Sequence, residues 1–140
     1  MMRRVLDTNV LIAARRSRSG ASNLLLRAAD HQEFVMIATV PMFLEYESVL
    51  LRPENLRALQ TDPAEVMGFL DYLATLVEPV RLSYLWRPQL IDPDDEMVLE
   101  AAVNGRADAI VTFNQKHFAP AARFGIKVLL PRDALRGIGL

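Results

Sequence analysis

Apolar residues along this chain gather into short runs that alternate with longer stretches of helical spacing. A short apolar run bounded by polar residues predicts a buried strand. The clearest run lies at residues 34–38, a second buried strand is expected at 109–112, and short strands that include basic residues are expected at 3–6, 80–82 and 126–130. The chain is therefore expected to contain short strands separated by segments long enough to be helices.

The segments between the runs carry helix-spaced apolar residues and recognisable helix boundaries. Thr39 and Pro41 predict one helix start, because a hydroxyl cap and an early proline suit the amides that lack partners there. Pro53 and Pro63 punctuate a further helical pair. The other expected helices cover residues 10–14, 21–29, 94–103, 114–118 and 131–135, the Thr39 helix runs to residue 51, and the segment 86–93 is expected to be a loop.

This alternation predicts a parallel sheet with helices on both faces, because each parallel connection needs a crossover that returns the chain. The expected fold class is therefore α/β. Ligands of such sheets bind in the crevice beyond the carboxyl ends of the strands. Asp7 and Asn114 each lie just past a predicted strand, so a site is expected at that edge.

The composition fits one globular domain over residues 1–140, since 51% of the residues are hydrophobic and domains commonly contain about 100 to 150 residues. The chain has no cysteine, which excludes thiolate metal sites and suits a reducing cytoplasm. No apolar run has the length of a signal-peptide core or of a membrane span. A cytoplasmic protein without membrane contact is expected.

The net charge of -1 provides no overall attraction to nucleic acid, so RNA binding would require a local basic patch. Arg15, Arg16 and Arg18 form the candidate cluster for RNA contact. A solvated polar loop explains the same residues equally well. The sequence leaves the two interpretations open.

Two groups of acidic and polar residues stand at predicted helix starts. Asp7, Thr8 and Asn9 lie between two apolar runs, and because one such residue is enough for a cap, Asp7 is expected to be a ligand as well. The acids at 92–96 suit the positive end of a helix dipole. Among them Asp95 shares its face with apolar residues, where an unpaired charge is costly, and Asp94 is the better cap candidate.

Other polar residues are less decisive. Glu45 and Glu47 lie two residues apart and point to different sides of one predicted helix. Periodicity leaves the choice open and leans towards Glu47 as the buried acid, because Glu47 shares its face with more large apolar residues. Asn114 is expected to cap the turn after it rather than to contact a metal. His31 and His117 lack metal-ligand spacing and are expected to be surface or otherwise satisfied histidines.

Carboxylates from separate segments that meet at one crevice repel one another, and a hard divalent cation such as Mg²⁺ or Mn²⁺ relieves that repulsion. Such an ion can activate a water molecule and neutralise charge that develops on a phosphate. The acidic residues therefore predict hydrolytic phosphodiester chemistry.

Four segments resemble the successive motifs of PIN domains. They read V-L-D-T-N-V at 5–10, L-E-Y-E-S-V-L-L-R-P at 44–53, D-P-D-D-E-M-V-L at 92–99 and A-D-A-I-V-T-F-N-Q-K-H-F at 107–118. Their order and spacing are similar to those of the family across nearly the whole chain, and the chain looks most like the VapC-like toxins. The resemblance implies a three-layer α/β/α sandwich with a central, mainly parallel sheet.

The resemblance also implies a site and an activity. By this resemblance Glu45, not Glu47, belongs to the site. The metal-binding and catalytic residues would be Asp7, Glu45 and Asp95, with hydrogen-bond support from Thr8, Asn9, Thr112 and Asn114. The implied activity is that of a metal-dependent endoribonuclease with Mg²⁺ or Mn²⁺ as cofactor, RNA as substrate, a small antitoxin protein as partner and a homodimer as the assembly.

The chain departs from the family pattern at Asn114 and His117, positions where acids are common. Fewer negative charges weaken metal binding, although Asn114 can offer a carbonyl oxygen, so one well-held ion is expected. One alternative is a PIN-like module that has lost catalysis and binds RNA or protein. A second is a different α/β domain in which Asp7 is phosphorylated, but such domains generally need a second acid or a lysine near the nucleophile.

Overall fold

The computed structural model describes residues 1–83 and 89–138. Its strands form one sheet of order β3-β2-β1-β4-β5, in which every neighbouring pair is parallel. The strands are β1 (Arg3–Leu6), β2 (Val35–Ala38), β3 (Val77–Pro79), β4 (Ala109–Val111) and β5 (Lys127–Leu129).

Helices connect all of these strands. They are α1 (Thr8–Arg16), α2 (Ala21–Asp30), α3 (Val40–Leu50), α4 (Pro53–Ala58), α5 (Pro63–Leu76), α6 (Pro93–Asn104), the 3-10 segment η1 (Gln115–Phe124) and α7 (Pro131–Arg136). In the described part of the chain, no helix combines the length and the apolar character needed to cross a membrane.

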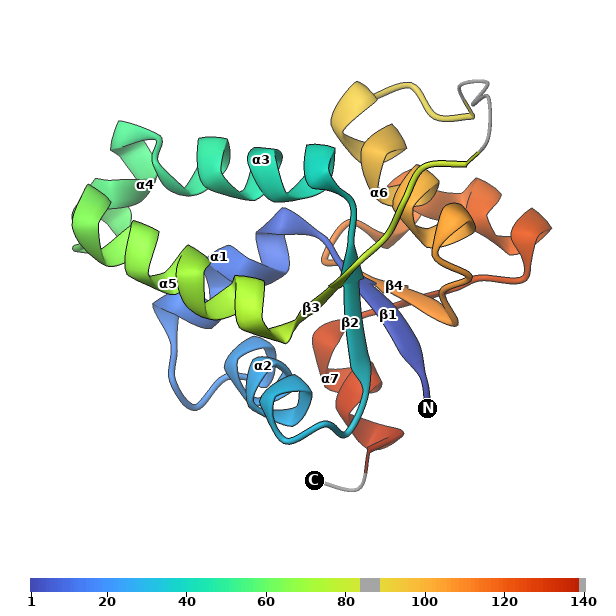
Figure 1. The fold of residues 1–140 in the computed structure, drawn as a ribbon, viewed down its shortest axis with the longest axis horizontal. Coiled ribbons are helices and arrows are strands. Elements are labelled where there is room, and N and C mark those ends of the chain that lie inside the picture. The colour runs from blue at the N-terminus through green and yellow to red at the C-terminus, as the bar shows by residue number, and fades with distance from the viewer. Residues whose placement is uncertain (84–88, 139–140) are drawn as a thin grey trace.

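Helices cover both faces of the sheet, as the alternation predicts. Helices α1, α2, α5 and α7 lie on one side, and α6 lies on the other (Figure 1). Helix α6 packs against β1, β2, β4 and η1, while α2 packs against α1 and α7. The predicted α/β class and three-layer sandwich are confirmed.

The central strand β1 positions the site. Val5 and Leu6 are fully buried, because helices cover this parallel sheet on both faces. The ladder with β4 continues one residue past the strand, where the amide of Asp7 donates to the carbonyl of Val111 at 2.9 Å. Asp7 is thereby held at the middle of the carboxyl edge of the sheet.

Some predicted elements differ from the observed ones. The strand expected at 80–82 is observed as β3, three residues earlier. Pro79 has no amide to donate, and it is tolerated there because β3 lies at the edge of the sheet. The turn expected at 114–118 continues to Phe124 with a kink at Phe118. Of the loop expected at 86–93, residues 86–88 lie outside the described residues, and α6 begins at Pro93.

Candidate active site at the carboxyl edge of the sheet

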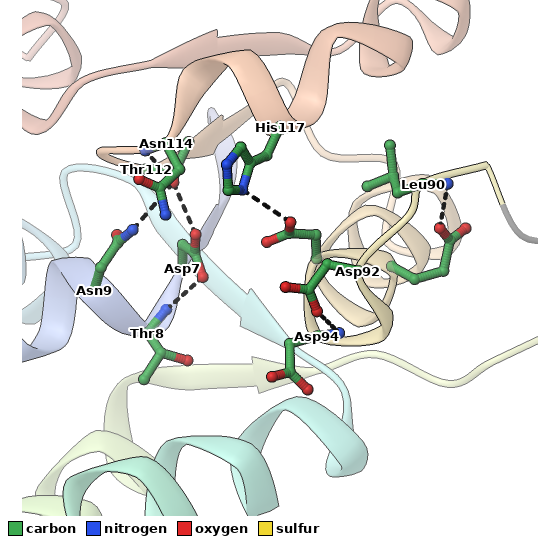
Figure 2. A network of polar contacts seen from close by, with 11 residues as sticks. Asp7, Thr8, Asn9, Leu90, Asp92, Asp94, Thr112, Asn114 and His117 are labelled. Carbon is green, nitrogen blue, oxygen red and sulfur yellow. Dashed lines mark hydrogen bonds and ion pairs between the residues drawn. The ribbon is translucent and has the colours of Figure 1, made fainter.

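Asp7 lies where β1 ends and α1 begins, and it is only 9% exposed. Its Oδ1 accepts a hydrogen bond from the amide of Thr8 at 2.8 Å, and its Oδ2 accepts one from the hydroxyl of Thr112 at 2.7 Å (Figure 2). Thr8 contributes its backbone amide to this contact, not its hydroxyl. Asp7 is thus the N-cap of α1, as expected, and its second oxygen is held by a segment more than a hundred residues later.

Thr112 is the centre of a small hydrogen-bond network. It is fully buried, and besides donating to Asp7 its hydroxyl oxygen accepts from the amide of Asn114 at 3.0 Å. The side-chain amide of Asn9 lies 3.5 Å from the same oxygen. The network joins the segment after β4 to the start of α1 and fixes the orientation of the Asp7 carboxylate.

Asn114 occupies the N-cap position of η1, but its side chain makes no capping hydrogen bond. The prediction of a side-chain cap is wrong, because the backbone there has φ -106° and ψ 57° rather than the extended conformation from which a cap reaches the first amides. The side chain instead lines the acidic cleft, the hollow bounded by Asp7, Glu45, Asp92, Asp94 and Asp95. In Figure 2 it lies beside Thr112 and above Asp7.

One face of α3 and the residue two positions after it form a wall of this cleft. The lining residues of this wall recur every three or four positions, as one helical face requires: they are Met42, Glu45, Val49 and Arg52. Glu47 is not among the lining residues. The periodicity leaned towards Glu47 because Phe43, Leu44, Leu50 and Leu51 share its face. Leu50 is 1% exposed and Leu44 is 60% exposed, so the apolar neighbours on that side do not mark the cleft.

The first turn of α6 forms another wall. Asp92 is the N-cap and accepts from the amide of Asp94 at 2.9 Å. The prediction that Asp94 is the cap is wrong, because Pro93 already occupies the first helical position and the cap is the residue before it. The side chain of Asp95 is 14% exposed and lines the cleft, in agreement with the inward orientation expected for it.

His117 contacts a predicted metal ligand. Its Nδ1 lies 3.0 Å from Oδ2 of Asp95 (Figure 2), and its side chain is 54% exposed. The expectation of a surface or otherwise satisfied histidine is confirmed, although the sequence did not identify Asp95 as the partner. No ligand spacing marks His117, and the available signal was its place in the last PIN-like motif, where an acid is common.

Burial raises the pKa of all three predicted ligands. For Asp7, burial outweighs the hydrogen bonds from Thr112 and Thr8, which lower the pKa, and nearby Asp95 raises it further. For Glu45, burial is followed by the charge of Asp94 as a cause of the raised pKa. For Asp95 the largest cause is again burial. The cleft therefore disfavours the charged form of these carboxyl groups, a cost that a bound cation would relieve.

Comparison with known proteins identifies the family. Residues 3–116 match the sequence model of the PIN domain. This chain belongs to the PIN domain family. The resemblance drawn from the motifs is thus confirmed, and no receiver domain with a phosphorylated Asp7 is needed to explain the acidic edge. No curated protein matches the PIN chain by sequence.

Two solved structures have a similar fold. VapBC2 from Rickettsia felis, bound to a DNA fragment from its promoter, aligns with a TM-score of 0.62 and 15% identity over 91% of this PIN domain and 98% of that chain. VapBC-1 from nontypeable Haemophilus influenzae aligns with a TM-score of 0.60 and 15% identity over 94% and 99% of the two chains. At this identity the likeness establishes the PIN fold.

The donor set of this PIN domain suits a hydrated hard cation. Within residues 1–83 and 89–138, no three Asp, Glu or His side chains converge closely enough to ligate one ion directly. Mg²⁺, however, retains several waters and commonly takes only one or two carboxylates from the protein. Asp7, Glu45 and Asp95 line a hollow of about 220 Å³, which has room for an ion with part of its water shell.

The arginines predicted to contact RNA lie at the far end of α1 from this cleft. Arg15 stacks over the ring of Phe69 at 4.9 Å and lies 3.9 Å from Glu65. Arg15 and Arg18 line a hollow beside α2 and α5, whereas Arg16 lines a different hollow. The three residues therefore divide between two surfaces, and their contact with RNA stays a prediction.

Proposed function

We propose that this PIN domain is a divalent-metal-dependent endoribonuclease and the toxin of a toxin–antitoxin pair. The observation that carries the proposal is that Asp7, Glu45 and Asp95, from three separate segments, line one cleft at the carboxyl edge of the sheet. Membership of the PIN family supports a nuclease. The toxin role is supported by two similar structures whose names are both VapBC.

Each acid has a distinct part in the proposed site. Asp7 is the most rigid, because both of its oxygens accept hydrogen bonds. Asp95 is oriented by His117 through Oδ2, and no hydrogen bond from the described residues engages its Oδ1. Glu45 faces them from the wall formed by α3. A side chain held in one orientation loses little freedom when it takes a ligand, so Asp7 would be the principal anchor of the ion.

Mg²⁺ or Mn²⁺ bound by Asp7, Glu45 and Asp95 would supply the Lewis acid for phosphodiester hydrolysis. The residues of the chain provide the rest. The buried Thr112 network keeps Asp7 pointed into the cleft, and Asn114 offers a neutral amide at the same rim. With Asn114 in place of a fourth acid, the site carries less negative charge, and one well-held ion is expected.

A matched pair of substitutions on α3 tests the proposal. Cleavage of a mixed single-stranded RNA is measured with Mg²⁺ or Mn²⁺ and again with chelator. Glu45→Gln should abolish cleavage, whereas Glu47→Gln, two residues away and outside the cleft lining, should not. Asp7→Asn should also abolish it. Cleavage that survives chelation, or that Glu45→Gln leaves intact, would show that the proposed metal-dependent reaction is wrong.

The catalytically weakened PIN module is the second candidate, and Asn114 at the cleft is the observation that favours it. The variant Asn114→Asp separates the two. A wild type without cleavage that gains a large activity on this substitution supports the module. A wild type that cleaves, with only a modest change in Asn114→Asp, supports the nuclease.

The proposed partner is a small antitoxin that covers the acidic cleft, with a basic side chain set against the carboxylates. We also propose a homodimer. Co-expression with the product of a neighbouring small open reading frame should yield a complex that no longer cleaves RNA, and light scattering of the free protein should give twice the 15.7 kDa chain mass. A monomeric mass, or a complex that stays active, would contradict these assignments.

A further inference from the structure

Among the described residues, the lining of the acidic cleft includes one basic side chain, that of Arg52. Arg52 follows Glu45 by seven residues and continues the same face beyond the end of α3. It is exposed, and its side chain makes no hydrogen bond or ion pair with the described residues. Its charge lowers the pKa of Glu45, although burial and Asp94 outweigh it. The guanidinium therefore stands at the rim with its hydrogen-bond donors available.

A second hollow adjoins the first and contains another cation. It shares Asp92 and Asp95 with the acidic cleft, so the two hollows meet at the first turn of α6. Lys116, one of its lining residues, is exposed and, in the part of the chain described, has no side-chain hydrogen bond or ion pair. Apolar Ile91, fully exposed, lines the same hollow.

These two cations lie on different sides of the acids. Helix α6 packs against both α3 and η1, and the acids that both hollows share lie at its start. Arg52 lines the first hollow and Lys116 the second. Arg52 follows α3, and Lys116 belongs to η1. A line along the surface from Arg52 to Lys116 thus passes Glu45 and Asp95.

We propose that a single RNA strand crosses the cleft along this line, with one phosphate held by Arg52 and another by Lys116. This inference rests on the proposed ribonuclease function. A polyanion that enters a cleft lined by carboxylates is repelled unless cations anchor it on either side, and phosphate contacts fix the register of a nucleic acid without reading its sequence. Arg52 suits a bidentate phosphate contact, and Lys116 suits a point-charge contact.

The chain offers a matched control for each anchor. Arg106 is an exposed arginine beyond the carboxyl end of α6, and Lys127 begins β5, so both lie at the opposite edge of the sheet from the cleft. Two kinds of measurement are made on Arg52→Ala, Lys116→Ala, Arg106→Ala and Lys127→Ala. One is KM and kcat for cleavage of a single-stranded RNA. The other is the Kd of that RNA, measured by anisotropy over a range of salt in an Asp7→Asn background that cannot cleave.

Arg52→Ala and Lys116→Ala should each raise KM and Kd by about threefold to tenfold, with kcat nearly unchanged, because a lost phosphate contact weakens ground-state and transition-state binding alike. Each should also reduce the slope of log Kd against log salt by about 0.7. Arg106→Ala and Lys127→Ala should leave KM, Kd and the salt slope unchanged.

The inference and the proposed function fail in different ways. If the wild type cleaves RNA but either Arg52→Ala or Lys116→Ala behaves like its control, the strand path is wrong and the nuclease stands. A fall in kcat at unchanged KM also overturns the path, since it would mean that the cation acts on the reaction and not on binding. If the wild type neither cleaves nor binds RNA, the proposed function itself is wrong.

Discussion

Replacement of Thr112 by valine should destabilise the protein and loosen its principal carboxylate. The variant keeps the shape of a fully buried side chain but removes the hydroxyl that donates to Asp7 and accepts from the amide of Asn114. A hydrogen bond to a charged group contributes about 1.5–3 kcal/mol. Unfolding entropy of about 2.1 cal/mol/K per residue over 140 residues amounts to about 0.29 kcal/mol/K. The melting temperature should therefore fall by about 5–10 °C.

Thermal unfolding followed by circular dichroism, in chelator at neutral pH, measures this effect. Thr112→Ser is the matched control, because it keeps the hydroxyl and loses only a methyl group, which should cost about 0.5–1.5 kcal/mol. Thr112→Val should also reduce the rise in melting temperature that Mg²⁺ produces, whereas Thr112→Ser should preserve it. If the serine variant melts as low as the valine variant, packing and not the hydrogen bond holds this position, and the reasoning fails.

Three further outcomes follow from the same structure. Burial raises the folded-state pKa of Asp7, so the folded protein binds the carboxyl proton of Asp7 more tightly than the unfolded chain does, and the free energy of unfolding falls as pH rises from the unfolded pKa through the folded pKa. In chelator, Asp7→Asn should therefore raise the melting temperature at pH values above the folded pKa and have little effect at pH values below the unfolded pKa. Tyr46→Phe removes the buried hydroxyl that donates to the carbonyl of Leu6 and should cost about 1–3 kcal/mol in urea unfolding. Gly105→Ala should lower the free energy of unfolding in urea by about 1–3 kcal/mol, since its Cβ would lie 2.5 Å from Ile37 Cδ1 and 2.9 Å from a backbone carbonyl. Gly68→Ala, whose Cβ would meet nothing within 4 Å in the interior of α5, should instead raise it by about 0.5–1 kcal/mol.

The order of strands and helices could be predicted from the sequence because each element has a local cause. Val5 and Leu6 in the run at 3–6 are apolar since β1 is covered on both faces, and Thr39 caps α3 through the amide of Met42 at 3.2 Å. Strand β3, which the sequence predicts three residues too late, has no such local cause. Its residues Val77–Pro79 are ordered by pairing with β2, and no local pattern marks an edge strand that contains proline.

The candidate site was predictable only in part. Asp7 could be found because three polar residues in a row between apolar runs exceed what capping requires. The choice of Glu45 over Glu47 came from family resemblance, since helical periodicity groups Glu47 with more large apolar residues although one of them, Leu44, is 60% exposed. Which side of α3 faces the acids depends on the packing of α3 against α6, two elements far apart in the chain.

By itself the sequence determined the α/β class, the position of Asp7 after the central strand, and the family, because periodicity, capping and motif spacing act over short stretches of chain. Only the tertiary structure decided the rest. It set Thr112 against Asp7, His117 against Asp95 and Asn114 into the cleft, and it left Arg52 at the rim. These contacts join residues separated by tens of positions, and the direction of each side chain depends on how remote segments pack around the sheet.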